Sequence, residues 1–274
     1  MGRLKANLKG ALAYISPDLA RAAVQSNRSI QRRIRQFHPP GVDQSLFYPQ
    51  QPDCQIPTIG HLYSQFLGER EDGTFVEIGA NDGVLVSNTW GLAERHWRGL
   101  MVEPVATLAE ACRRNHSRHP GVVVVETAVS DGTESEITLS LAGAFTTANQ
   151  EQKREYGQIA WSVYELTGRD VVVPAQTLDH LLESADLSPC FDVLVVDVEG
   201  LESAVFAGFT LSKWRPQMMI VELVDTHPEL TATRRPDATL GRSLVDAGYS
   251  VVYKDAINTV FVRDDVWTAA FAAK

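Results

Sequence analysis

The sequence predicts an α/β fold: a mostly parallel sheet covered by helices on both faces, with an antiparallel hairpin at its end. After residue 73, near-continuous apolar runs alternate with stretches of helical periodicity, which is typical of buried parallel strands joined by helices. The last two apolar runs, 249–254 and 259–263, are separated by a short polar turn, which indicates a hairpin. A chain of 274 residues, 44% hydrophobic and 22% charged, is large enough for one such domain with an appendage.

Residues 1–37 precede the predicted sheet and carry eight basic residues against a single acid. Leucine and alanine at helical spacing predict one or two short helices here. Such a segment makes peripheral contact with an anionic membrane, packs on its own domain or a neighbouring subunit, or serves as an organelle transit peptide. The short apolar stripe favours packing.

Five prolines lie within residues 38–58, which excludes a regular element and predicts a linker or an extended wrap over the surface. The main domain is then expected over residues 59–274. Its predicted strands are the apolar runs 74–79, 99–103, 122–129, 135–141, 171–174, 191–197, 218–224, 249–254 and 259–263. Its predicted helices are 59–67, 86–96, 105–116, 177–185, 200–207 and 237–247. Residues 142–170 interrupt the alternation and are expected to form a lid or binding loop, whose aromatic side chains either close over a substrate or pack onto the sheet.

Composition narrows the function classes. Three widely spaced cysteines argue against a zinc site or a disulfide framework and favour a reducing compartment, so a cytoplasmic location is expected. No apolar run reaches the roughly 18 residues that a membrane-spanning helix needs, and the N-terminus lacks the apolar core of a secretory signal. The net charge of −9, whose negative part lies after residue 37, argues against nucleic acid as the main partner.

The first predicted strand leads into a glycine turn at residues 77–83, a place where backbone N–H groups approach a ligand. Its spacing, Glu-x-Gly-x-x-x-Gly, differs from the Gly-x-Gly-x-x-Gly that places a pyrophosphate. The turn's acids, Glu77 and Asp82, would repel phosphates but tolerate a cationic ligand. Glu103 ends the second strand, 24 positions after Gly79, where a carboxylate can bind the ribose of NAD or of S-adenosylmethionine. The acids of the turn favour S-adenosylmethionine.

Acidic side chains also follow the later strands. Asp197 follows a fully apolar strand, Glu199 lies two residues further on, and Glu222 ends the next strand. In neighbouring strands these carboxylates would converge, either as ligands of a divalent ion such as Mg²⁺ or as a general base. The structural alternative is that Asp197 holds its loop through backbone N–H groups while Glu199 caps the next helix. His227 is a further candidate base, although a loop histidine before a proline is more often structural.

Seven short phrases over roughly residues 60–225 occur in the order of a known family: 63–69, 75–83, 87–89, 97–104, 128–131, 177–179 and 197–202. Together they resemble the FkbM-type methyltransferases, a branch of the S-adenosylmethionine-dependent enzymes. The resemblance implies a Rossmann-like class I methyltransferase fold with a seven-stranded sheet, and O-methylation of a hydroxyl on a sugar, glycolipid or secondary metabolite. Residues 67–69 depart from the family pattern, which more usually reads Gly-Gln/Glu-Asp there.

The resemblance also implies roles for single residues. Those expected at the cofactor are Glu77, Gly79, Asn81, Asp82, Gly83, Glu103, Ala128 and Val129. The glycine turn would hold the methionine part, Glu103 the ribose, and the pair at 128–129 the adenine. The resemblance places Asp197 and Glu199 next to the methyl group and the acceptor. Because an alcohol must lose its proton to react, Asp197 is expected to act as the base, assisted by Glu222 and His227, or to bind Mg²⁺ together with Glu199 and Glu222.

Two other functions remain open. A Rossmann-type NAD-dependent oxidoreductase shares the start of the fold, and NADH binding would distinguish it. A non-catalytic cofactor-binding module, recruited to a membrane or complex by residues 1–37, would bind the cofactor without transferring a methyl group to a small-molecule or glycan hydroxyl.

Overall fold

The computed structural model describes residues 43, 45–141, 146, 169–223, 238–255 and 257–272. The basic segment 1–37, most of the 142–170 insertion and His227 lie outside these residues, so the expectations about them remain predictions. Within the described residues, no helix is both long enough and apolar enough to cross a membrane.

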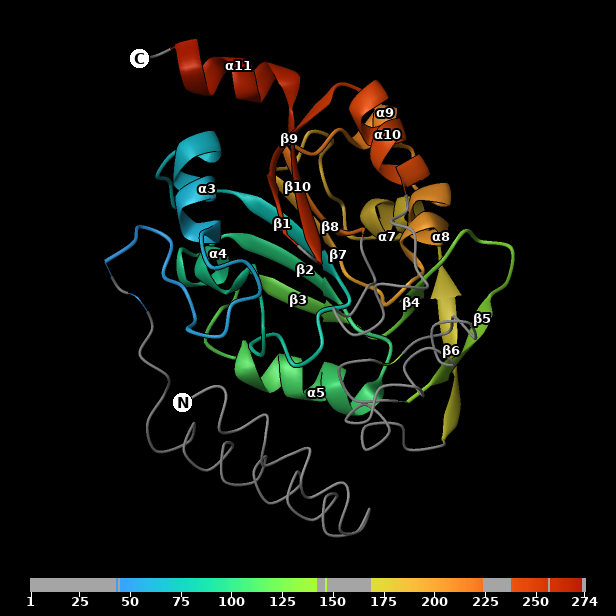
Figure 1. The fold of residues 1–274 in the computed structure, drawn as a ribbon. Helices are drawn as coiled ribbons and strands as arrows, with labels where there is room; N and C mark the ends of the chain where they lie inside the picture. The colour runs from blue at the N-terminus through green and yellow to red at the C-terminus, as the bar shows by residue number, and fades with distance from the viewer. Residues whose placement is uncertain are drawn as a thin grey trace, which may run out of the picture.

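A seven-stranded sheet forms the centre of the fold, in the order β3-β2-β1-β7-β8-β10-β9 (Figure 1). The first five of these strands are parallel, whereas β10 runs antiparallel to both β8 and β9. The strands are β1 Thr74–Ile78, β2 Arg98–Val102, β3 Val122–Val125, β7 Val193–Val196, β8 Met218–Glu222, β9 Tyr249–Lys254 and β10 Asn258–Arg263. The structure thus confirms the predicted mostly parallel sheet with its antiparallel hairpin.

A second, three-stranded sheet has the order β4-β6-β5 and was not predicted. The run 122–129, predicted as one strand, divides into β3 and β4 (Ala128–Val129), and β4 pairs with β6 (Asp170–Gln176). β5 (Glu136–Ser140) lies antiparallel to β6 on its other side. The hydroxyl of Thr127 donates to the carbonyl of Pro174 at 3.0 Å, next to the point where the chain leaves the main sheet. An unbroken apolar run does not indicate where the chain stops pairing with one sheet and begins to pair with another.

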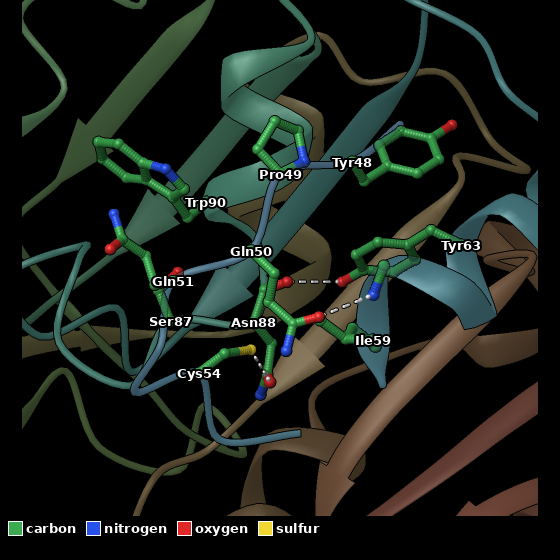
Figure 2. Close-up of a pocket in the computed structure, with 12 residues that line it drawn as sticks. Tyr48, Pro49, Gln50, Gln51, Cys54, Ile59, Tyr63, Ser87, Asn88 and Trp90 are labelled. Carbon is green, nitrogen blue, oxygen red and sulfur yellow. Dashed lines mark hydrogen bonds between the residues drawn. The ribbon is translucent and has the colours of Figure 1, made fainter. Parts of the chain in front are cut away.

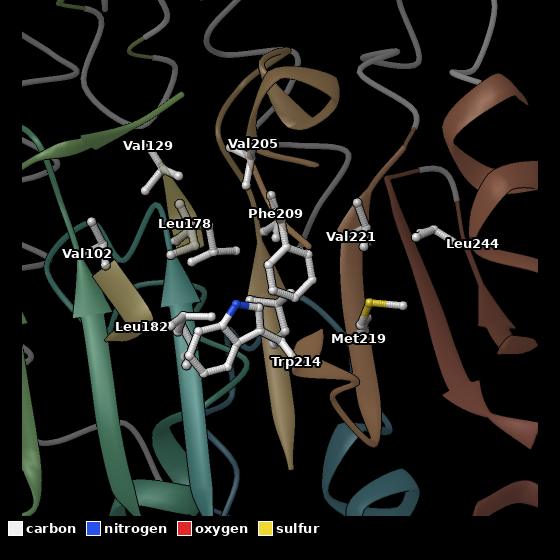
Figure 3. Close-up of a cluster of buried hydrophobic side chains, with 14 of the residues drawn as sticks. Val102, Val129, Leu178, Leu182, Val205, Phe209, Trp214, Met219, Val221 and Leu244 are labelled. Atoms are coloured by element: carbon white, nitrogen blue, oxygen red, sulfur yellow. The ribbon is translucent and has the colours of Figure 1, made fainter. Parts of the chain in front are cut away.

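Helices cover both faces of the main sheet (Figure 1). They are α3 Ile59–Leu67, α4 Trp90–Glu94, α5 Ala106–Asn115, α7 Leu178–Ser184, α8 Glu202–Ala207, α9 Leu211–Trp214, α10 Ala238–Asp246 and α11 Asp264–Ala272. Because strand side chains alternate in direction, Val76 and Ile78 face a core formed with α7 to α10, whereas Phe75 faces a core formed with α3 to α5. Figure 3 shows the first of these cores, with Trp214 at its centre.

The helix predicted over 86–96 is only α4, five residues long. The carboxylate of Asp82 accepts hydrogen bonds from the backbone N–H groups of Val84 (3.0 Å) and Leu85 (2.7 Å), and Val86 has a φ of +55°. This side-chain-directed turn replaces the first helical turns. The C-terminal hairpin forms the last two strands of the sheet. One more helix, α11, follows it and packs near α3.

Residues 45–58, called the strap below, contain no helix or named strand, as the prolines predicted, and form a series of turns and bends that packs on the domain. Tyr48 and Ile56 are buried in the core that α3 and α4 also contribute to. The hydroxyl of Tyr48 donates to the carbonyl of Gly68 at 2.6 Å, and the backbone N–H of Gln55 donates to the carbonyl of Val86 at 3.3 Å. The strap therefore has a fixed place beside the loop that follows β1.

Candidate active site

The carboxyl ends of β1 and β7 form the switch point of the sheet. The chain runs from β1 outward through β2 and β3, then returns to place β7 on the other side of β1. Loops that leave in opposite directions at such a point open a crevice where ligands bind. Gly79 begins the loop after β1, has a φ of +88°, and lies so close to β7 that an added Cβ would be 1.7 Å from the carbonyl oxygen of Asp197. Only glycine fits there.

Glu77 lies beneath this loop and is buried. Its carboxylate accepts a 2.6 Å hydrogen bond from the hydroxyl of Thr89. Burial raises the pKa of Glu77 to about 8, the hydrogen bond from Thr89 opposes the rise, and the charge of Asp197 adds to it. Glu77 therefore holds a proton at neutral pH in the absence of a nearby cation.

Glu103 follows β2 and links the end of that strand to the glycine turn. Its two carboxylate oxygens accept hydrogen bonds from the backbone N–H of Asn81 (2.9 Å) and of Val105 (2.8 Å). Burial raises the pKa of Glu103 to about 7, against the lowering effect of these two donors. Asp82 instead shapes the turn through backbone hydrogen bonds.

The pair predicted to face the adenine occupies β4, and both side chains are buried. Ala128 belongs to a small cluster in which Val105, two residues after Glu103, also packs. Val129 points the other way, into the core beside Leu178. Ala128 is thus the member of the pair on the Glu103 side.

Three carboxylates meet at the ends of β7 and β8. The two strands are parallel neighbours with Val196 opposite Val221, which brings Asp197 beside Glu222. Glu199, with a φ of +54°, completes the group, and one oxygen of each carboxylate lies within 4.8 Å of the others. We call these three residues the acid cluster. Their convergence follows from the strand order that the sequence predicted.

Glu222 is the most deeply buried member of the acid cluster. Burial, the charges of Asp197 and Glu199 and a hydrogen bond with Asp197 hold its pKa well above the usual range. Within the described residues, Oε2 of Glu222 and Nδ2 of Asn258, its register partner on β10, have no hydrogen-bond partner. Glu222 thus carries a proton beside Asp197.

The capping role that the sequence offered to Glu199 is not seen, because the N-cap position of α8 is Leu201, whose side chain makes no capping hydrogen bond; Glu202, the first residue of the helix, instead holds the preceding loop. It accepts hydrogen bonds from the backbone N–H groups of Val198 and Gly200, each at 3.2 Å, and so closes the loop before α8. Burial raises its pKa to about 7. The loop that carries Asp197 and Glu199 is therefore tied to the start of the following helix.

Two amides that the sequence did not single out reach the acid cluster. Nε2 of Gln55 donates to Oδ2 of Asp197 at 3.2 Å, and Nδ2 of Asn88 donates to Oε1 of Gln55 at 2.9 Å. Asn88 lies within a phrase, 87–89, on which the family resemblance rests, but Gln55 lies in the strap and carries no such signal. A cavity of about 10 Å³ beside Asn88, lined also by Tyr63 and Trp90 (Figure 2), has room for about one water molecule and not for a cofactor.

Comparison with known proteins gives the following matches. A family model described as the Methyltransferase FkbM domain matches residues 77–250. Among solved structures, an O-methyltransferase from Bacillus cereus in complex with SAH is 16% identical, with 86% of this chain and 97% of that chain covered and a TM-score of 0.42. The METTL16 MTase domain is 12% identical, with 76% and 69% covered and a TM-score of 0.41.

Monomeric WbdD is 12% identical with a TM-score of 0.38, and the match covers 73% of this chain. The chain spans 38% of the length of WbdD. Among curated proteins, none matches the sequence.

Proposed function

The chain belongs to the FkbM methyltransferase family, and on that premise we propose that it transfers a methyl group from S-adenosylmethionine to a hydroxyl oxygen of a sugar, glycolipid or secondary metabolite. The observation that supports an oxygen acceptor is the pair of carboxyl groups of Asp197 and Glu222, at the ends of β7 and β8 beside the switch point of the sheet. An alcohol is a poor nucleophile until its proton is removed, so a carboxylate beside the reacting oxygen is the group this reaction needs.

The residues at the crevice fit a cationic cofactor. Glu77 and Glu103 lie at the ends of β1 and β2, and burial raises the pKa of both. A cation placed among them restores their charged forms, whereas a pyrophosphate would add to the negative charge. The same contrast argues against the NAD-dependent alternative. We propose that Glu103 and the glycine turn hold the ribose and methionine parts of the cofactor.

When bound, S-adenosylmethionine supplies a methyl group attached to a positively charged sulfur, and this sulfur is the leaving group and becomes a neutral thioether. The protein then has two tasks. It must hold the acceptor oxygen in line with the methyl carbon, because much of the rate enhancement of such a displacement comes from positioning. It must also take the hydroxyl proton, and we assign that step to the carboxylate of Asp197, which Glu222 and Gln55 hold by hydrogen bonds.

The acid cluster supports a second use of the same side chains. One oxygen each from Asp197, Glu199 and Glu222 lies within 4.8 Å of the others, and oxygen ligands of this kind suit Mg²⁺. We propose that Mg²⁺ competes with the proton of Glu222 for this position and would there lower the pKa of an acceptor hydroxyl. Removal of divalent ions with EDTA, followed by addition of Mg²⁺, tests this proposal. If Mg²⁺ takes part, activity is lost in EDTA and returns with Mg²⁺; unchanged activity in EDTA would show that the acid cluster binds a proton and no metal ion during the reaction.

The function is tested with methyl-labelled S-adenosylmethionine and cell extract, followed by identification of the labelled product. Asp197→Asn should lower turnover by roughly 10²- to 10⁴-fold, the usual contribution of a positioned base, and leave the affinity for S-adenosylmethionine within about twofold, since cofactor contacts are assigned elsewhere. Calorimetry with NADH serves as the control. Tight NADH binding, or full activity of Asp197→Asn, would contradict the proposal.

A further inference from the structure

The strap brings a residue into the site from outside the family match. It precedes residues 77–250, yet Tyr48 packs edge-on against Tyr63 and Trp97, with ring centroids 5.6 and 5.8 Å apart. Tyr48 and Ile56 are almost fully buried, at 1% and 0% exposure. Anchors on this scale hold the strap in one position on the domain, so its polar side chains are presented to the crevice with fixed geometry.

The polarity of the amide contacts follows from one backbone group. The N–H of Ile56 can only donate, and it donates to the side chain of Asn88 at 3.1 Å, so Oδ1 of Asn88 must face it. The Nδ2 of Asn88 then faces Gln55, which must present its oxygen there. Gln55 is consequently left to present its NH₂ group to Asp197. The chain of contacts delivers a donor, not an acceptor, to this carboxylate.

Gln55 gives Asp197 a donor that does not depend on protonation, unlike the hydrogen bond that Asp197 shares with the carboxyl of Glu222. Glu77 lies on β1 beside Asp197, and Glu199 and Glu222 share the acid cluster with it, so its titratable neighbours in the part of the chain that the structure describes are carboxyls. The N–H from Gln55 fixes the plane of the Asp197 carboxylate. In the same short phrase as Asn88, Thr89 donates to Glu77. Thr89 therefore holds Glu77 directly, and its neighbour Asn88 holds Asp197 through Gln55.

We propose that Gln55 is a positioning residue that orients the Asp197 carboxylate toward the acceptor hydroxyl, and that the strap is thus part of the acceptor side of the site. The inference rests on the proposed function, because it assigns a role in the step that Asp197 performs. It extends the catalytic unit to a segment outside the family-matched residues.

Gln55→Glu tests the role with little change of shape. The new carboxylate still accepts from Asn88, but it presents an oxygen instead of an N–H to Asp197. With labelled S-adenosylmethionine and the extract fraction that the wild type methylates, we expect kcat to fall at least tenfold at pH 8, with KM for the cofactor within about twofold. The activity of the variant relative to the wild type should rise as the pH falls from 8 to 6, because the introduced carboxyl regains a donor when it is protonated.

Gln50→Glu is the matched control. Gln50 lies in the same strap and donates to the carbonyl of Ile56 at 3.2 Å, but it does not touch Asp197. The control adds the same charge and disturbs the strap, so a merely structural effect would lower the Tm and leave the pH profile of turnover as in the wild type. If Gln50→Glu reproduces both the loss of kcat and its recovery at low pH, the positioning role is wrong.

The double variant Gln55→Glu/Asp197→Asn tests the contact without turnover. Its two substitutions reverse the polarity of the hydrogen bond, since the amide introduced at position 197, just after β7, can donate to the carboxylate introduced in the strap. We expect Gln55→Glu to lower the Tm at pH 8 by about 2–4 °C and the double variant to regain most of that loss while remaining inactive. Additive losses in the double variant would refute the contact. If the double variant regains its Tm but Gln55→Glu alone shows no loss of kcat, the contact exists and the positioning role is refuted. If the wild type methylates no extract fraction, the proposed function is refuted, and the Tm values of the variants still decide whether the contact exists.

Discussion

Glu77 provides the most direct test of the electrostatics at the crevice, through the substitution Glu77→Gln. Its carboxylate is buried under the glycine turn, and burial raises its pKa from 4.5 to about 8. The folded protein thus retains a proton that the unfolded chain releases above pH 4.5. The contribution of Glu77 to the free energy of unfolding is therefore highest below that pH and is lost as the pH rises toward 8. Glutamine keeps an oxygen for the hydroxyl of Thr89 but has no proton to lose.

The magnitude follows from the pKa interval. Each pKa unit corresponds to about 1.4 kcal/mol, so the interval from 4.5 to about 8 corresponds to ~5 kcal/mol of unfolding free energy. Roughly 4 kcal/mol of this is lost between pH 5 and pH 9. Relative to the wild type, Glu77→Gln should therefore gain about 4 kcal/mol over the same range.

Urea unfolding of the cofactor-free protein at pH 5, 7 and 9 measures the difference between variant and wild type at each pH, so that titrations common to both cancel. Glu134→Gln is the matched control, because Glu134 is exposed on the turn before β5 and should show no such gain. A difference for Glu77→Gln that stays constant from pH 5 to 9, within about 0.5 kcal/mol, would show that the wild-type Glu77 does not hold its proton.

Further predictions concern the glycine turn and the end of β2. Gly79→Ala should lower the unfolding free energy by more than about 2 kcal/mol, because its Cβ would lie 1.7 Å from the carbonyl of Asp197. Gly248→Ala, with a nearly equal φ of +89° but with Oδ2 of Asp264, at 3.8 Å, as the nearest contact of the added Cβ among the described residues, should cost only about 1–2 kcal/mol in the same urea experiment. Equal losses would remove the steric argument for Gly79. The affinity for S-adenosylmethionine, measured by calorimetry, should rise as the pH increases from 6 to 8, because Glu103, with a pKa of about 7, gains its charge in that range. Glu103→Gln should weaken binding and flatten this rise, and an unaltered pH dependence in the variant would exclude Glu103 from cofactor binding.

The parts of the fold that the sequence predicted are those in which each residue signals its own environment. Parallel strands covered on both faces are apolar on both faces, so β7 and most of β8 are continuous apolar runs, whereas Glu77 interrupts the run in β1. Acids that end such strands must meet at one edge, which is why the convergence of Asp197 and Glu222 was predictable from strand order.

The parts that were missed depend on partners far away in the chain. Gln55 and Asp197 are 142 positions apart, and a glutamine in a proline-rich stretch carries no periodicity that indicates its partner. The helix expected from residue 86 fails because a single side chain, Asp82, captures two backbone N–H groups, which outweighs the weak helical preference of the residues that follow. In both cases a specific polar contact, and not a pattern, decides the structure.

The buried acids at this edge also bear on how the proposed reaction proceeds. Burial raises the pKa of Glu77, Glu103 and Glu202 to between about 7 and about 8. Such carboxyls gain their charge when a cation arrives, so a sulfonium binds more favourably than a neutral ligand of the same shape. Methyl transfer converts the cationic cofactor into a neutral thioether, which removes this stabilisation at the moment the product forms. The electrostatics of the crevice therefore favour binding of the donor and release of its product with one set of side chains.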